Sequence, residues 1–122
     1  MTDRIYTVEE ARAALPDVAT LVRTLADAHA RMEERHEKVT ESISQNGGGK
    51  AHKEFLDASL AAASALSKLD EMSILVRDPA TGLIDFPSER DGEQIYLCWR
   101  LGEDGIDFWH PPETGFAGRQ PL

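Results

Sequence analysis

Residues 93–110 read EQIYLCWRLGEDGIDFWH, and the pattern of this segment predicts the secondary structure of the C-terminal half of the chain. Apolar and polar side chains alternate over residues 93–101, a pattern typical of a β-strand with one buried face. Residues 102–105 then predict a four-residue hairpin loop, and residues 106–110 predict the returning strand. Two prolines, Pro111 and Pro112, follow and end the pairing because proline has no N–H to donate. The segment therefore predicts an antiparallel β-hairpin.

A loop of this length implies a register for the hairpin. If Leu101 faces Ile106, the pairs that follow are Arg100 with Asp107, Trp99 with Phe108, Cys98 with Trp109 and Leu97 with His110. One face is then apolar and suited to cover helices, while the other carries an Arg100–Asp107 charge pair. This register places Trp99 and Trp109 on opposite faces. It also places Cys98 and His110 on opposite faces, which argues against a nucleophile–base pair, so we expect a packed and inert cysteine. A slip of the register by one residue would bring the two side chains to the same face.

More of the C-terminal half is expected to join this sheet. Residues 83–86 predict a short strand that Pro87 ends, and residues 73–76 are either a strand or the last turn of a helix. We expect residues 114–122 to fold back over the second face of the sheet, with Phe116 as their anchor. The alternative is that part of that face stays open as a binding groove.

The N-terminal half has the pattern of helices. Thr7 and Glu10 fit a capping box, which predicts a helix start. Because Pro16 interrupts the pattern, we predict a short helix over residues 8–15 and a long one over residues 16–44. Apolar residues recur along the long helix at spacings of three and four, typical of a helix packed lengthwise on another. They are Val18, Val22, Leu25, Met32, Val39 and Ile43.

A glycine-rich turn at residues 46–49 predicts the end of the long helix. A second helix is predicted over residues 52–72, so the two would form an antiparallel hairpin. Its expected apolar side consists of Phe55, Leu56, Leu60, Ala63, Leu66 and Leu69. Since a hairpin buries only one side of each helix, either the C-terminal half covers the rest or two chains pair into a four-helix bundle. We expect a homodimer formed through the helices.

Composition restricts the class of protein. The 122 residues suit a single domain, 1–122, made of a helical hairpin (1–72) and a small sheet with a tail (73–122). The expected fold class is α+β: a long antiparallel helical hairpin, a small antiparallel β-meander and an ordered C-terminal tail. A formal net charge of −9 argues against nucleic acid or an anionic membrane as partner. The lone Cys98, the lack of a secretory signal and the lack of a membrane-spanning apolar run predict a cytoplasmic protein.

Two familiar chemistries fit the helical half poorly. The glycines before Lys50 follow a helix rather than a strand, and Ala51 stands where a phosphate-binding loop needs Ser or Thr. Glu33 and His36 have the Glu-x-x-His spacing of di-iron bundles, but the facing stretch of the second helix offers no acid. His29 and His36 are two turns apart, too far to share one ion. We expect both histidines to be structural.

The C-terminal half offers better candidates for a site. Glu103 and His110, with Asp85 or Asp104, could form a small oxygen and nitrogen metal site, although no close-spaced ligand motif is present. A second candidate is a ligand-binding region made of Tyr96, Arg100, Trp109 and Arg119, which would hold a protein partner or a small anion. Most arginines of this half are expected to form structural pairs with carboxylates.

Two further patterns carry a resemblance over the whole chain. They are YTxEEA…LP within residues 6–16 and DFP…RDG…LCWRxGE…WH…GFxGRxPL within residues 85–122. Together they resemble a bacterial family catalogued as a domain of unknown function. The resemblance implies a small stand-alone bacterial protein, and it supplies no activity.

These observations leave the enzymatic activity open and favour one of two functions. The preferred interpretation is a non-enzymatic interaction or regulatory module, self-associating through its helices and binding a partner or small anion through its C-terminal half, with no cofactor. The alternative is a metal-binding or metal-dependent protein that holds a divalent ion around His110 and Glu103.

Overall fold

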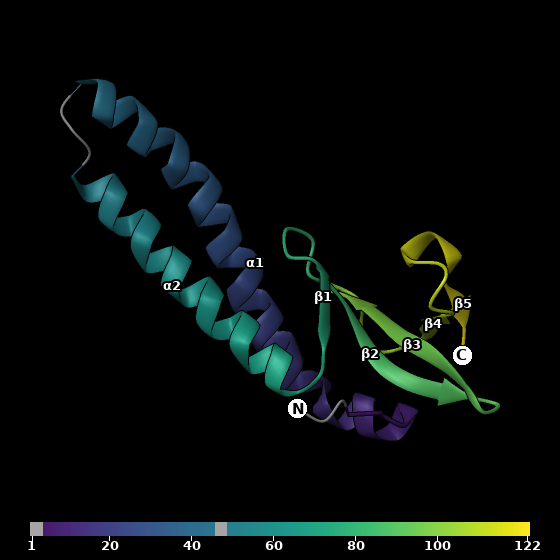
Figure 1. Cartoon of the computed structure of the whole chain (residues 1–122). Helices are drawn as coiled ribbons and strands as arrows, with labels where there is room; N and C mark the ends of the chain where they lie inside the picture. The colour runs from purple at the N-terminus through teal and green to yellow at the C-terminus, as the bar shows by residue number, and fades with distance from the viewer. Residues whose placement is uncertain (1–3, 46–48) are drawn as a thin grey trace.

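The structure is a computed structural model, which describes residues 4–45 and 49–122 and, within 35–45, the backbone alone. Helix α1 (Val8–Gln45) and helix α2 (Lys50–Glu71) form a hairpin, and a sheet follows. The strands are β1 (Leu75–Asp78), β2 (Leu83–Arg90), β3 (Glu93–Arg100), β4 (Phe108–His110) and β5 (Gln120–Pro121), with a 3-10 turn, η1 (Phe116–Gly118). The strands pair antiparallel in the order β1-β2-β3-β4-β5, and the hairpin extends away from them (Figure 1). The predicted α+β class, with its hairpin and meander, is confirmed.

The start of α1 has the predicted capping box. The Thr7 N–H donates to Glu10 Oε1 at 2.9 Å, and the Glu10 N–H donates to Thr7 Oγ1 at 3.0 Å. Tyr6, just before the cap, is fully buried, and its hydroxyl donates to the Met72 carbonyl at 2.6 Å. The N-terminus of α1 is thereby tied to the end of α2.

The predicted break at Pro16 is wrong, because α1 runs through it without interruption. An interior proline loses one hydrogen bond and costs about 3 kcal/mol. Helical turns on both sides of Pro16 nevertheless bury apolar side chains: Ala11 before it, and Val18 and Val22 after it, are all 0% exposed. Burial of each valine contributes about 1.5–3 kcal/mol, which outweighs the lost bond. In Figure 1 the purple first turns of α1 run in a different direction from the rest of the helix.

The buried side of α2 also differs from the prediction. Its buried residues are Ala58, Ala62, Ala65 and Leu69. Leu69 alone was among the residues expected there, whereas Leu56, Leu60 and Leu66 are exposed. On α1, Val18, Val22 and Leu25 are buried as predicted, while the side chains of Val39 and Ile43 and the turn residues 46–48 lie outside the described part. The small alanines allow α2 to approach α1 closely, so the leucines face away from α1.

The register of the β3–β4 hairpin is one residue away from the prediction. Tyr96 pairs with His110, Leu97 with Trp109, and Cys98 with Phe108. Since opposed residues point to the same face and neighbours alternate, Trp99 and Trp109 share one face, and Cys98 and His110 share the other. The predicted Arg100–Asp107 pair does not form within β3 and β4.

A longer connection explains the shift. Residues 101–107 link the two strands, and Ile106 within them is 0% exposed. Arg12 of α1 donates to the Ile106 carbonyl from Nη2 at 3.0 Å, and Trp99 Nε1 donates to the Glu103 carbonyl at 3.2 Å. The Arg12 contact belongs to the packing of the sheet on α1, so the loop sequence alone could not reveal it.

Strand β2 continues past Pro87, where the sequence predicted its end. Pro87 pairs with Tyr96 of β3, and β1 covers only the first residues of β2 on the other side. The missing N–H of Pro87 therefore lies toward the side on which β1 does not reach it, as proline in a sheet requires. Its carbonyl accepts the Tyr6 N–H at 2.7 Å, which joins the N-terminal segment to the sheet.

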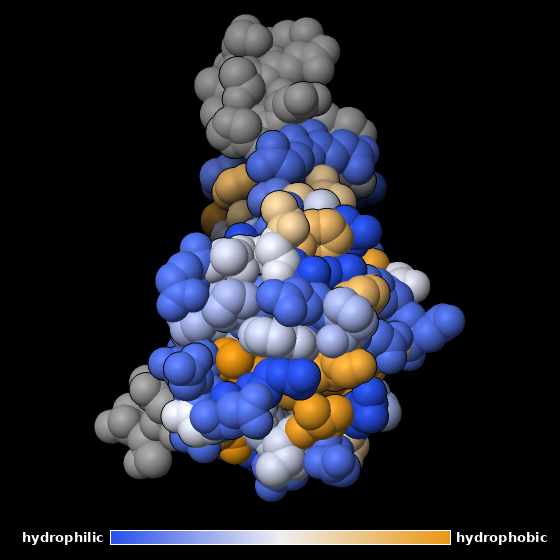
Figure 2. Space-filling view, turned by 90° about the vertical axis from the view of Figure 1, so that its right-hand side faces the viewer, coloured by the Kyte–Doolittle hydropathy of each residue, from blue (hydrophilic) through white to orange (hydrophobic). Residues whose placement is uncertain are grey.

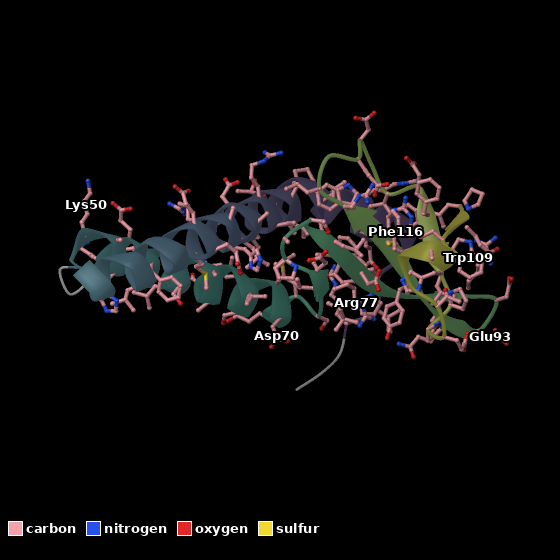
Figure 3. The ribbon with its side chains drawn as sticks, turned by 90° about the horizontal axis from the view of Figure 1, so that it is seen from above. Lys50, Asp70, Arg77, Glu93, Trp109 and Phe116 are labelled. Carbon is pink, nitrogen blue, oxygen red and sulfur yellow. The ribbon has the colours of Figure 1, made fainter. Side chains whose placement is uncertain are left out.

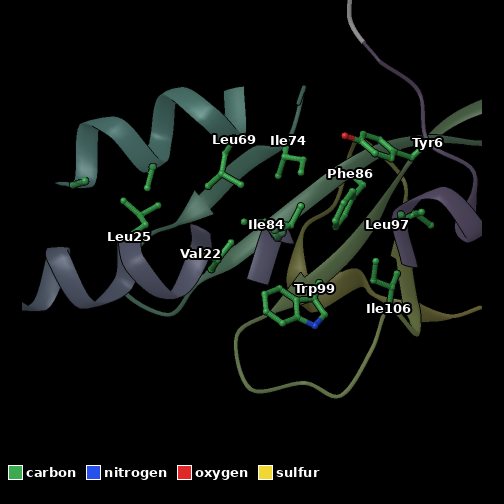
Figure 4. Packing of buried hydrophobic residues seen from close by; sticks show 14 of the residues in the cluster. Tyr6, Val22, Leu25, Leu69, Ile74, Ile84, Phe86, Leu97, Trp99 and Ile106 are labelled. Carbon is green, nitrogen blue, oxygen red and sulfur yellow. The ribbon is translucent and has the colours of Figure 1, made fainter. Parts of the chain in front are cut away.

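The core lies between the helices and one face of the sheet (Figure 4). Ile84, Phe86, Leu97 and Trp99 point into it from β2 and β3. The Phe86 ring meets the ring of Tyr6 edge-on, with centroids 5.2 Å apart.

Among the described residues, neither helix has a stretch of length and hydropathy sufficient to cross a membrane. The opposite face of the sheet is the one that carries the polar side chains discussed next.

Candidate metal site

Three side chains that can ligate metals meet on the face of the sheet that points away from the helices. Asp85 of β2 pairs directly with Cys98 of β3, and His110 of β4 lies one diagonal position further on. All three are buried, and one ligand atom from each lies within 4.8 Å of the others. The sequence indicated Asp85 and His110, and the structure brings these two together with Cys98.

Asp85 is the central residue of this cluster. Its side chain is 1% exposed. Oδ2 accepts a hydrogen bond from Arg77 Nε at 2.8 Å and lies 2.9 Å from His110 Nε2. Oδ1 is buried and has no hydrogen-bond partner among the described residues. An unpaired buried carboxylate oxygen is costly, so this atom is one that a cation would stabilise.

His110 is held in one orientation by its neighbour in the chain. Nδ1 lies 2.8 Å from the Pro111 carbonyl oxygen, and because a carbonyl only accepts, Nδ1 carries a proton. Nε2 then points at Asp85 Oδ2, and the two need either a proton between them or a cation close to both. A backbone carbonyl that fixes the far nitrogen of a ligating histidine is a common feature of metal sites.

Cys98 lies under the same tail as His110. Burial, and secondly the negative charge of Asp85, raise the pKa of the Cys98 thiol to about 11, against a lowering effect of Arg119. In the metal-free chain the thiol is therefore protonated at neutral pH, which disfavours a nucleophilic thiolate. The sequence predicted an inert cysteine because Cys98 and His110 were expected on opposite faces of the sheet. That reason is wrong, because the two residues lie on the same face.

A cavity of about 290 Å³ opens beside the three donors. Besides Asp85, Cys98 and His110, it is lined by Arg77, Leu83, Pro112, Thr114, Gly115 and Phe116. Thr114, Gly115 and Phe116 belong to the C-terminal segment, residues 114–122, that was expected to cover this face. The tail therefore forms one wall of a cavity large enough for a water molecule or a small ligand.

Glu103 lies outside the donor cluster, because Arg119 engages both of its oxygens. Arg119 Nη1 donates to Oε1 at 2.9 Å and Nη2 to Oε2 at 2.8 Å, and the Arg100 N–H donates to Oε1 at 2.8 Å. The hydrogen bond from Arg119 lowers the pKa of Glu103, with burial opposing it. Asp104, the other acid considered, is exposed in the loop.

The four residues of the predicted ligand-binding region do not form one surface. Trp109 lies on the face toward the helices, where it packs against the core and under Arg90, whose guanidinium carbon is 4.9 Å from the ring. Tyr96 and Arg100 share the face of the cluster, and Arg119 reaches it from the tail.

Aromatic rings engage the arginines near the cluster. Arg119 lies 4.1 Å from the ring centroid of Phe108 and 4.2 Å from that of Phe116, and Arg100 lies 4.5 Å from that of Phe116. Figure 3 shows Arg77 of β1 and Phe116 of η1 at the sheet end of the molecule, and Figure 2, viewed from that end, shows apolar patches among hydrophilic residues. Arginines stacked and paired in this way hold the tail in place.

Cys98 and Arg77 are the members of the site that sequence reasoning missed. Cys98 was assigned to the correct face of β3, but the predicted register turned His110 away from it. Matching Trp109 with Leu97, as the most apolar pair, would have given the observed register. Arg77 was counted only among the structural arginines, and no local motif distinguished it.

The fold and the cluster define a class: an α+β protein in which a helical hairpin covers one face of an antiparallel meander, with a buried Asp–Cys–His group on the other face. The chain belongs to the family described as uncharacterized conserved protein (DUF2203), whose sequence model matches residues 4–122. Comparison with curated proteins and with solved structures gave no match. The resemblance to a family of unknown function is thus confirmed, and the family description assigns no activity.

Proposed function

We propose that the chain is a metal-binding protein, in which Asp85, Cys98 and His110 hold one divalent transition-metal ion. The observation that carries the proposal is Asp85 Oδ1, a buried oxygen with no hydrogen-bond partner among the described residues, within a group of three mixed donors. It replaces the Glu103-based donor set expected from sequence with one that contains a sulfur.

The donor set favours zinc. Zn²⁺ binds thiolate, imidazole and carboxylate ligands in tetrahedral sites, and a mixed S, N, O set excludes the hard cations Mg²⁺ and Ca²⁺ as preferred ions. Three protein ligands leave one position for a water or a small molecule, and the cavity beside the cluster offers the space. Cys98 ligates as a thiolate, so binding of the metal releases the proton of the thiol. Because an oxidised sulfur would not ligate, the proposal includes a reducing compartment, in agreement with the cytoplasm expected from the lone cysteine.

Arg77 has a supporting role in this proposal. Its Nε donates to Asp85 Oδ2 at 2.8 Å, and its guanidinium carbon lies 5.1 Å from the ring centroid of Tyr96. This contact engages Oδ2 and leaves Oδ1 without a hydrogen-bond partner among the described residues. Hydrogen bonds to ligating carboxylates orient them and tune metal affinity.

The test is the metal content of untagged protein, combined with cobalt substitution. We expect about one zinc per chain by elemental analysis. Co²⁺ should give a sulfur-to-cobalt absorption band that Cys98→Ser removes, and Asp85→Asn and His110→Gln should lose the zinc. The matched control is His52→Gln, because His52 is exposed on α2 and should retain full metal content.

The opposite result is equally clear. Wild-type protein that contains no stoichiometric metal and shows no cobalt band would overturn the proposal. The Arg77–Asp85–His110 contacts would then be a purely structural ion-pair network that shares a proton. Circular dichroism of each variant separates loss of the metal from loss of the fold.

The interaction module favoured by the sequence is a second candidate function. Its anion-binding part is weakened because aromatic rings and Glu103 already engage Arg100 and Arg119. Its self-association part gains support from the leucines that α2 exposes.

A further inference from the structure

Helix α2 exposes a continuous stripe that we name the α2 stripe: Lys53, Leu56, Leu60, Ala63, Ser67 and Asp70. Their alternating spacings of three and four residues place them on one side of the helix. Leu60 is 71% exposed and Leu56 is 48% exposed. Single apolar side chains are common on protein surfaces. Two leucines one turn apart on the same side of a helix form an apolar patch, which is typical of an interaction surface.

The α2 stripe faces away from the rest of the chain. The residues of α2 buried on α1 are Ala58, Ala62, Ala65 and Leu69. Each lies two positions further along than a member of the stripe, which is a rotation of about 200° around the helix. The contacts of α2 with the described side chains of α1 therefore leave the stripe uncovered.

We propose that the α2 stripe docks against the same stripe of a second copy of this chain, with the two α2 helices antiparallel. The spacing is self-complementary about a two-fold axis midway between Leu60 and Ala63. Leu60 then faces the partner's Ala63, and Leu56 faces the partner's Ser67. Each large side chain meets a small one, so two leucines per chain are buried without a clash.

The charges at the two ends of the α2 stripe select this orientation. Lys53 lies toward the N-terminal end of α2, where Figure 3 labels Lys50, and Asp70 lies at the other end, close to the sheet. An antiparallel pair brings Lys53 to the partner's Asp70 at both ends of the interface, where Lys53 also donates to Asp57 of its own helix at 2.9 Å. A parallel pair would bring Lys53 to the partner's Lys53 and Asp70 to the partner's Asp70, which repel.

Zero-length carbodiimide cross-linking followed by mass spectrometry tests the geometry. Within one chain Lys53 and Asp70 are separated by about 26 Å of helix, so they cannot be cross-linked to each other. The antiparallel dimer predicts a Lys53–Asp70 cross-link, found only in the dimer band. Cross-linked dimers in which Lys53 joins other acids of the partner, and Asp70 is untouched, would overturn the proposed alignment.

The oligomeric state of designed variants tests the interface. Wild-type chain should sediment as a dimer, and Leu60→Glu should weaken the dimer by about 100-fold by placing a charge at its centre. Leu122→Glu is the matched control, because Leu122 is 40% exposed in the tail and its change should leave the dimer intact. Lys53→Asp and Asp70→Lys should each weaken it, by about tenfold, and the double variant should restore it.

A wild-type chain that is monomeric at all concentrations would refute the proposal, as would a dimer that Leu60→Glu does not affect. Unchanged circular dichroism of Leu60→Glu shows that the loss of the dimer is not unfolding. Metal content is measured on the same samples, so the metal site and the dimer are tested independently.

Discussion

Replacing Glu103 with glutamine should destabilise the chain by about 2 kcal/mol at neutral pH, since a hydrogen bond to a charged group contributes about 1.5–3 kcal/mol. Arg119 donates to both carboxylate oxygens, at 2.9 and 2.8 Å, and the exposed fractions of the two side chains, 12% for Arg119 and 22% for Glu103, leave the pair only partly screened. Glutamine keeps one acceptor and presents an NH₂ group to the guanidinium in place of the other.

The loss should depend on pH in a defined direction. The hydrogen bond from Arg119 lowers the pKa of Glu103 below its ordinary value of 4.5, and the Arg100 N–H acts in the same direction. A carboxylate with a lowered folded-state pKa stabilises the native state above its ordinary pKa, and this contribution disappears as the pH falls through the folded value. Glutamine does not titrate. The difference between wild type and Glu103→Gln should therefore be constant above about pH 5 and shrink in acid.

Urea denaturation at pH 7 and near pH 3 measures this difference. At neutral pH a loss of about 2 kcal/mol corresponds to a fall in Tm of about 8 °C for a chain of this size. Glu113→Gln is the matched control, because Glu113 is exposed in the tail and should change stability by less than about 0.5 kcal/mol. A destabilisation by Glu103→Gln that is equally large at both pH values would show that the charge pair is not its source.

Three other perturbations have expected outcomes. Leu69→Ala should lower the free energy of unfolding by about 3 kcal/mol, because the Leu69 side chain is fully buried between helix and sheet. Urea denaturation measures this loss, and a value below about 1 kcal/mol would contradict the packing. Gly82→Ala should lower the melting temperature more than Gly92→Ala. Both glycines have positive φ, but a Cβ at Gly82 would lie 2.6 Å from Leu101 Cβ, whereas a Cβ at Gly92 would meet open space. Equal melting temperatures of the two variants would contradict this prediction. In metal-free protein the rate of alkylation of Cys98 should be low at pH 8 and rise until about pH 11, and a plateau near pH 8 would refute burial of the thiol.

The sequence predicted the elements well because their signals are local. The capping box and the alternation in β3 each depend on neighbouring residues, and both elements formed. Pro16 failed as a predictor because the burial of Val18 and Val22 is a tertiary effect that outweighs one lost hydrogen bond. The leucines of α2 failed for a related reason: the alanines on the opposite side allow closer contact with α1.

The candidate site was predicted in part, and the limit was the register. Asp85 and His110 were identified from their residue types, and the structure places their side chains 2.9 Å apart. Cys98 was not considered as a ligand, and the four-residue loop assumed between β3 and β4 placed it on the opposite face from His110. The length of that connection depends on the burial of Ile106 and on its hydrogen bond from Arg12, which lie far apart in the sequence.

The observed register is also the one that gives the ring nitrogens of His110 their hydrogen-bond partners. In the predicted register His110 would point into the apolar face, where each unpaired ring nitrogen would cost about 1–3 kcal/mol. In the observed register Trp109 joins the core, and His110 finds the Pro111 carbonyl and Asp85 on the other face. The cluster therefore lies where the tail, not the helices, covers the sheet. The cavity beside the cluster is lined by Phe116, so the tail that the Arg119–Glu103 pair holds in place borders Asp85, Cys98 and His110.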